Sequence, residues 1–128
     1  MFEVMASEEF EAAHSLPGYP GKCSRLHGHS WKVEAVVRGE KLDGLGMLVD
    51  FKSVQAALKA VLDRLDHRHL NELPPFSGGM APTAENLAAY VYGEMEHADL
   101  FAEGGGAFLH AIRVWESPHS CAAYLGKG

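Results

Sequence analysis

The chain has 128 residues, of which 47% are apolar and 22% are charged, and its formal net charge is −6. We expect a single domain over residues 1–128 with an ordinary hydrophobic core. The negative charge argues against nucleic acid or an anionic membrane as a partner. Two cysteines are too few for a disulfide framework, and we see neither a signal-peptide pattern nor an apolar run of membrane length, so we expect a cytoplasmic protein.

The first third of the chain predicts two antiparallel strands. Residues Glu3–His14 read as the first strand, and Phe10, Ala12 and His14 share one face of it. Two prolines and two glycines in Ser15–Gly21 predict a loop. Alternation resumes over Leu26–Val37 and predicts the second strand.

The remainder predicts two helices followed by two strands. Asp50 is a good N-cap, and apolar residues recur at helical spacing from Phe51 to Leu65. Thr83 caps a second helix that ends near His97, and strands follow at Phe108–Trp115 and Ala122–Leu125. The order ββααββ indicates an α+β fold, in which two helices pack on one face of an antiparallel sheet.

The histidines are the first candidates for a functional site. His27 and His29 are two residues apart, so in a strand they point to the same face. His14, on the neighbouring strand, has the parity needed to join them. Three imidazoles with one open position are typical of catalytic zinc, although iron and copper also accept such ligands. The alternative is a strand face that is simply solvated.

A thiol lies four residues before this His-x-His pair. Cys23 sits at the end of the proline- and glycine-rich loop, close to Lys22 and Arg25. Positive neighbours favour the thiolate, which is the reactive form. The alternative is an inert buried thiol, which is common. We favour a reactive thiol.

Two further groups carry acid–base potential. Asp66 and His67 form a possible acid–base pair, in which the carboxylate fixes the imidazole tautomer, or else they only decorate the end of a helix. Glu116 shares one strand face with Ile112 and Val114, so burial is expected and a donor must satisfy its carboxylate. The alternative for Glu116 is an outward-facing position near an edge.

Two other metal-site patterns fit the sequence less well. Gly21, His27, His29 and Glu34 match the first half of a cupin motif, but Glu34 has the opposite parity to the histidines. The two predicted helices also disagree with an all-β barrel. A zincin-type hydrolase is excluded because the sequence has no H-E-x-x-H.

Six segments, which occur in family order over most of the chain, together resemble the 6-pyruvoyl-tetrahydropterin synthase / 6-carboxy-5,6,7,8-tetrahydropterin synthase family. They are Phe10–His14, Cys23–His29, Gly46–Phe51, Leu65–Asn71, Pro82–Asn86 and Trp115–Ser117. The resemblance implies the tunnelling fold, in which the sheets of several subunits close into a barrel. It also implies a homohexamer built as a dimer of trimers, with active sites at subunit interfaces.

The same resemblance implies a role for each candidate residue. Zn²⁺ would be held by His14, His27 and His29, and Cys23 would be the proton-abstracting thiolate, with Asp66 and His67 as its relay. The remaining implied residues contact the substrate: Glu116, which is also counted among the catalytic residues, would anchor the amino-pyrimidine edge of the pterin, and Thr83 and Glu85 match positions near that pocket.

The implied reaction starts from 7,8-dihydroneopterin triphosphate. Carboxy-type enzymes release acetaldehyde and triphosphate and supply 7-deazaguanine (queuosine) biosynthesis, whereas pyruvoyl-type enzymes eliminate triphosphate and keep the side chain. The Cys-x-x-x-His-Gly-His spacing resembles the carboxy type more closely. A pyruvoyl synthase and a non-catalytic, zinc-stabilised pterin-binding module are the alternatives. Lys22, Arg25 and Arg68 are candidates for holding the triphosphate.

Overall fold

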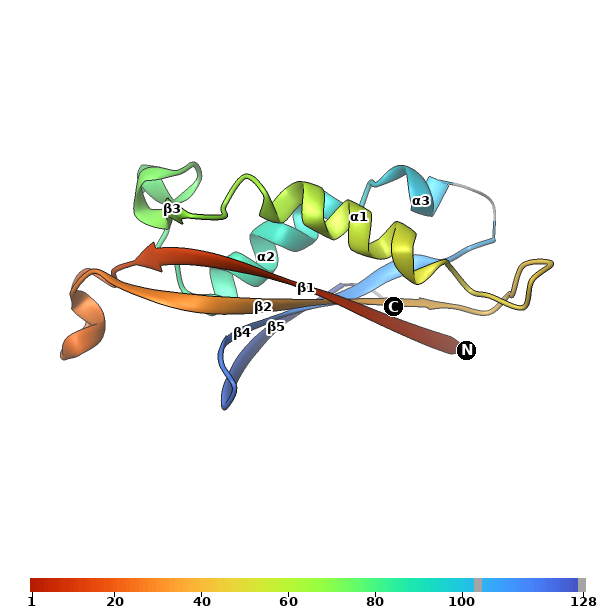
Figure 1. Ribbon diagram of the computed structural model, residues 1–128, viewed down its shortest axis with the longest axis horizontal. Helices are drawn as coiled ribbons and strands as arrows, with labels where there is room; N and C mark the ends of the chain where they lie inside the picture. The colour runs from red at the N-terminus through yellow and green to blue at the C-terminus, as the bar shows by residue number, and fades with distance from the viewer. Residues whose placement is uncertain (103–104, 127–128) are drawn as a thin grey trace.

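The computed structural model describes residues 1–102 and 105–126 and consists of one sheet with helices on one side, as Figure 1 shows. The strands are β1 (Phe2–His14), β2 (His27–Gly39), β3 (Arg68–His69), β4 (Phe108–Ser117) and β5 (Ser120–Leu125). The helices are α1 (Phe51–Leu62), α2 (Ala84–Met95) and the short α3 (Asp99–Ala102). The strand order is β3-β1-β2-β4-β5. The predicted α+β class is confirmed.

The structure differs from the prediction in its shortest elements. β3 is parallel to β1 through two register positions, Ala12 with Arg68 and Ala13 with His69, so the sheet is mixed and not wholly antiparallel. The second helix ends at Met95 instead of His97, and α3 follows as a separate turn. Segments of two to four residues carry no periodic signal, which is why the sequence did not predict them.

The helices begin at the predicted caps and pack on the sheet through apolar faces. The Asp50 carboxylate accepts a hydrogen bond from the Lys52 N–H at 2.8 Å, and the Thr83 hydroxyl accepts one from the Asn86 N–H at 3.1 Å. The largest fully buried side chains of the core include Trp31, Leu58, Leu62, Leu87 and Ile112. Burying each aliphatic one contributes about 1.5–3 kcal/mol, so packing on the helices fixes which sheet face is internal.

The register of β1 and β2 brings the predicted histidines together at one end of the sheet. His14 pairs with His27, and Ala12 pairs with His29, so all three imidazoles lie on the helix-covered face. Glu34 points to the opposite face, where its Oε1 accepts a hydrogen bond from the Trp115 indole at 2.6 Å. The parity argument against a cupin site therefore holds. No helix in the described residues has the length and apolar character needed to cross a membrane.

Candidate metal centre

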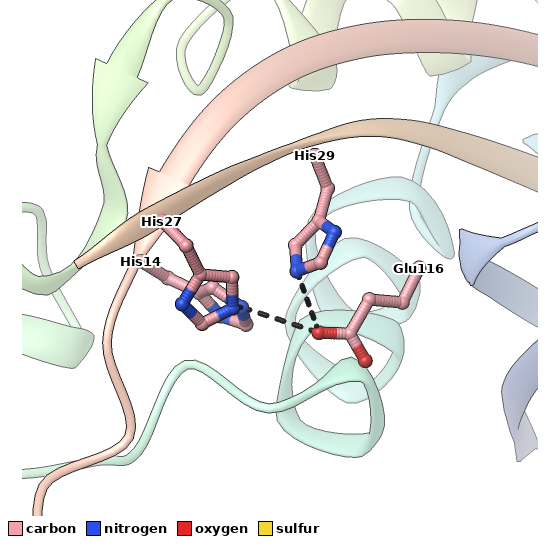
Figure 2. Close-up of side chains that lie close together, drawn as sticks. All are labelled: His14, His27, His29 and Glu116. Carbon is pink, nitrogen blue, oxygen red and sulfur yellow. Dashed lines mark hydrogen bonds and ion pairs between the residues drawn. The ribbon is translucent and has the colours of Figure 1, made fainter. Parts of the chain in front are cut away.

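Four side chains from three strands converge at this end of the sheet. His14 is the last residue of β1, His27 and His29 begin β2, and Glu116 lies near the end of β4. One ligand atom from each of the four lies within 4.8 Å of the others, as the close-up in Figure 2 illustrates. The Glu116 Oε1 atom lies 3.2 Å from His14 Nε2 and 2.9 Å from His29 Nε2.

Backbone carbonyls fix the orientation of two of the imidazoles. The Pro82 carbonyl lies 2.7 Å from His14 Nδ1, and the Arg25 carbonyl lies 2.7 Å from His27 Nδ1. A carbonyl only accepts hydrogen bonds, so each Nδ1 carries the proton and each Nε2 presents a lone pair. These two Nε2 atoms face each other at 3.0 Å. Two facing lone pairs repel each other, so a shared cation, either a metal ion or a proton, would stabilise this arrangement.

The imidazole of His29 is also suited to bind a cation. His29 Nε2 is buried and makes no hydrogen bond within the described residues, although Glu116 Oε1 is close, because the contact lacks hydrogen-bond geometry. Burial lowers the pKa of both His14 and His29 below the ordinary 6.5. Both rings are therefore neutral at pH 7, which is the form that binds a metal ion.

The donor set fits a small divalent metal. Tetrahedral zinc with bonds of about 2.0–2.1 Å places its ligand atoms roughly 3.3 Å apart. Three separations in the group, 2.9 and 3.2 Å from Glu116 Oε1 to the Nε2 atoms of His29 and His14 and 3.0 Å between the Nε2 atoms of His14 and His27, are close to that value, and all four ligand atoms lie within 4.8 Å of one another. The group can therefore bind a metal, and three nitrogens with one carboxylate oxygen suit zinc well.

Trp31 and Pro82 support the centre, and the sequence analysis missed both roles. Trp31 is fully buried, and its ring lies edge-on to those of His14 and His29, with centroids 5.0 and 5.1 Å away. Its indole N–H donates to the Ala12 carbonyl at 3.2 Å, which fixes the ring. The Trp31 position in the alternating pattern was visible in the sequence, whereas the contact from Pro82 crosses 68 residues and left no local signal.

Glu116 lies on the predicted face but in an unexpected place. It continues the helix-facing parity of Ile112 and Val114, which pair with Ala35 and Val33. The sequence analysis assigned it a catalytic and substrate-binding role and no place among the metal ligands, whereas the structure places its carboxylate against the imidazoles. The Glu116 side chain is 30% exposed, whereas the His14 side chain is 1% exposed. The carboxylate is thus accessible from outside while it touches the buried group.

Asp66 and His67 form a pair that is held by the outer edge of β1. The Glu11 N–H donates to Asp66 Oδ1 at 2.9 Å, and the His67 N–H donates to the Glu11 carbonyl at 2.6 Å. Asp66 Oδ2 lies 3.0 Å from His67 Nδ1. His67 has φ of 58°, in the left-handed region that non-glycine residues seldom adopt and that recurs at functional sites. The structure therefore orients this pair tightly.

A shallow cavity of about 520 Å³ lies beside this pair at the β3 edge of the sheet. Its lining includes Glu11, His29, Ser30, His67, Arg68 and His69. Glu11 and Ser30 have the opposite parity to His29, so this cavity is lined chiefly from the sheet face that the helices leave uncovered. Arg68, one of the cations considered for the triphosphate, also lines it.

The other predicted site residues lie outside that lining. Cys23 is half-buried in a short 3-10 turn, Lys22–Ser24, and no hydrogen bond in the described residues joins its thiol to Asp66 or His67. Thr83 caps α2 and follows Pro82, which contacts His14, so it lies beside the metal group. Glu85 is exposed in the first turn of α2. The structure brings the metal ligands together but not the thiol with its expected relay.

Comparisons with known proteins agree with this geometry. The family model described as 6-pyruvoyl tetrahydropterin synthase matches residues 3–127. The chain belongs to this family. The 6-carboxy-5,6,7,8-tetrahydropterin synthase of Synechocystis sp. is 36% identical, over 98% of this chain and 94% of its own. The 6-pyruvoyl tetrahydrobiopterin synthase of Dictyostelium discoideum is 28% identical, over 84% of this chain and 76% of its own.

A solved structure supports the fold assignment of this family member. The 6-pyruvoyl tetrahydropterin synthase of Caenorhabditis elegans superposes with a TM-score of 0.82 at 26% identity. The alignment covers 98% of this chain and 96% of that one. The likeness therefore extends over the sheet, both long helices and the loops between them. The family resemblance predicted from six sequence segments is confirmed.

Proposed function

We propose that the chain is a zinc-dependent lyase that converts 7,8-dihydroneopterin triphosphate to 6-carboxy-5,6,7,8-tetrahydropterin, with release of acetaldehyde and triphosphate. The observation that carries the proposal is the gathering of three imidazoles and one carboxylate whose ligand atoms lie within 4.8 Å of one another. The relatives named as carboxy-type synthases range from 28% to 36% identity and those named as pyruvoyl-type from 28% to 30%, and the higher upper value favours the carboxy product. Such a product belongs to 7-deazaguanine (queuosine) biosynthesis.

His14, His27 and His29 would hold the metal ion. When bound, zinc supplies Lewis-acid polarisation of the substrate's side-chain hydroxyls and of the adjacent C–H bond. Glu116 would hold the amino-pyrimidine edge of the pterin, with Thr83 and Glu85 near it. Arg68, which lines the adjoining cavity, and the loop cations Lys22 and Arg25 would contact the triphosphate.

Cys23 would move the proton at the first side-chain carbon of the substrate. A thiolate near positive side chains is a competent base at neutral pH. Asp66 holds His67 in one orientation, and the pair would exchange that proton with Cys23. Since the thiol and the pair are not hydrogen-bonded within one chain, their cooperation fits a site shared between subunits.

We propose that such sharing occurs in a homohexamer made of two trimers. Among the described residues, the outer edge of β1 is paired with β3 at only two positions, although β1 spans Phe2–His14. β5 ends the sheet on the other side, and the face opposite the helices is left uncovered (Figure 1). Open edges of this kind pair readily with strands of another copy. Light scattering on the purified protein tests the assembly, and a monomer would contradict it.

One incubation tests the activity. The zinc-loaded protein is incubated with 7,8-dihydroneopterin triphosphate, the products are identified by mass spectrometry, and acetaldehyde is assayed separately. We expect 6-carboxytetrahydropterin with equimolar acetaldehyde and triphosphate. A product that keeps the three-carbon side chain, with triphosphate but no acetaldehyde, would assign the pyruvoyl reaction instead. Pterin binding without any product would leave a non-catalytic binding module.

A further inference from the structure

Two roles of Glu116, as a metal ligand and as the anchor of the pterin, use the same carboxylate oxygen. Its Oε1 atom lies against the Nε2 atoms of His14 and His29, at 3.2 and 2.9 Å, where a fourth metal ligand would be. Figure 2 shows that the other carboxylate oxygen points away from the imidazoles. In the substrate-free geometry the carboxylate therefore faces the metal group with one oxygen only.

Holding a pterin demands a different arrangement. The amino-pyrimidine edge presents two N–H donors side by side, and a carboxylate that accepts both uses both of its oxygens. An Oε1 atom that completes a metal's ligand set has committed one of its two lone pairs and is held against the imidazoles, so it is a weaker and less available arm of that fork. The two roles of Glu116 therefore compete for the same atom.

The Glu116 side chain is less restrained than the imidazole of His14. Its side chain is 30% exposed, and its contacts in the described residues are those that Oε1 makes with the imidazoles. It lies at a shift in the β4–β5 register between Trp115 and Ser117. His14 is 1% exposed and anchored by the Pro82 carbonyl. A rotation of Glu116 thus disturbs neither the core nor the other three ligands.

We propose that Glu116 exchanges between two positions: it completes the metal's ligand set in the substrate-free protein and turns away to hold the amino-pyrimidine edge when a pterin binds. The second position rests on the proposed function, whereas the first stands on the geometry alone. The exchange frees a coordination position only when substrate is present. By linkage, metal and the pyrimidine edge then weaken each other's binding by the same factor, on the order of 5- to 150-fold.

The test uses the protein loaded with Co²⁺ in place of zinc, because the visible absorption of Co²⁺ reports its ligand set. Isocytosine, which has the same pyrimidine edge but no side-chain hydroxyls, serves as the probe. We expect isocytosine to change the Co²⁺ spectrum of the wild-type protein toward the spectrum of the Glu116→Gln variant without isocytosine. We also expect Glu116→Gln to weaken metal binding about tenfold or more. Isocytosine should bind the metal-free wild-type protein more tightly than the metal-loaded one.

Controls separate a local exchange from a general disturbance. Glu34→Gln changes a buried carboxylate on the opposite face of the same sheet and should leave the Co²⁺ spectrum and its response to isocytosine unchanged. If Glu116→Gln does not fold, Glu116→Asp keeps the charge but shortens the reach, and should shift the spectrum in the same direction.

Two results would overturn the proposal. An unchanged spectrum and metal affinity in Glu116→Gln would show that Glu116 is not a ligand. A changed spectrum in that variant, with no response of the wild type to bound isocytosine, would show a ligand that never exchanges. Turnover of 7,8-dihydroneopterin triphosphate is measured in parallel. Turnover without a spectral response would contradict the exchange of Glu116 and support the proposed function. A spectral response without turnover would support the exchange and contradict the proposed function.

Discussion

The two halves of the site differ in how completely a single chain builds them. The metal group has three imidazoles in contact, two of them fixed by backbone carbonyls and one fully buried. The thiol half is open: the turn that carries Cys23 is largely exposed, and the imidazole of His67 is 76% exposed. The fold of one chain thus brings the candidate metal ligands together, while it leaves the residues proposed for proton transfer apart.

The physical reason lies in where each half is attached. The histidines occupy long paired strands, whose register is fixed by side chains that pack against the helices. Cys23 lies in a loop and Asp66 in the turn after α1, and each of these segments is set by only a few contacts. Removing a metal ligand should therefore act inside one subunit, whereas removing the thiol should leave each subunit intact.

The largest effect is expected from His27→Ala. Loss of one of three imidazoles should weaken metal binding by more than the 10- to 100-fold typical of changes to the supporting hydrogen bonds, and turnover should disappear with the metal. Bound metal per chain is measured by mass spectrometry after dialysis. His97→Ala, at a side chain that is 88% exposed, is the matched control and should keep its metal. Undiminished metal in His27→Ala would rule out the three-histidine centre.

The next effect is expected from Cys23→Ala. Turnover should fall by about 10²- to 10⁴-fold, because a positioned acid–base group contributes that much, while bound metal and thermal stability should stay at the wild-type level. Cys121→Ala removes the other free thiol, which is exposed on β5, and should retain activity. Wild-type turnover in Cys23→Ala would refute the proposed role of the thiolate and leave the metal group as the whole catalytic apparatus.

Most of the metal half could be predicted from the sequence. The period of two along β1 and β2 placed His14, His27 and His29 on one face, and the caps at Asp50 and Thr83 gave the helix starts. These are local patterns, and strong alternation or helical spacing survives folding because burial enforces it. The same alternation excluded Glu34 from the site.

The rest depended on contacts between distant segments. Alternation gave the face of Glu116 but not its distance to His29, which depends on the pairing of β2 with β4 and on the register shift beside it. The Pro82 carbonyl reaches His14 from a loop whose path has no periodic pattern. β3 is two residues long, below what any pattern can indicate. Family resemblance supplied the roles of Cys23 and Asp66, and these stay predictions.

A third variant tests whether the metal group depends on the buried Trp31 ring that packs against it. Trp31→Ala should lower the free energy of unfolding by about 3–5 kcal/mol, as expected for a fully buried aromatic ring. Metal affinity should fall as well, about tenfold, because the His14 and His29 rings lose the surface that orients them. Leu58→Ala is the control: it removes buried volume on α1 and should reduce stability without changing metal affinity. Equal metal affinities in the two variants would deny Trp31 an orienting role.

The smallest expected effect is on stability and comes from the charge of Asp66. The Glu11 N–H, followed by His67, holds the pKa of the Asp66 carboxyl below its usual 3.8. A carboxyl whose pKa is lower in the folded state contributes stability that is fully present above the unfolded value and is lost as the pH falls through the folded one.

Asp66→Asn keeps the oxygen that accepts from Glu11 and removes only the charge. Its deficit in unfolding free energy should therefore be constant from about pH 7 to pH 5 and should shrink below about pH 3.8, as measured by urea titrations of the metal-free protein. Asp63→Asn, which breaks an exposed pair with Lys59, gives the scale of an ordinary surface contact. A deficit that persists unchanged to the lowest pH would show that the charge of Asp66 is not its cause and would contradict this prediction.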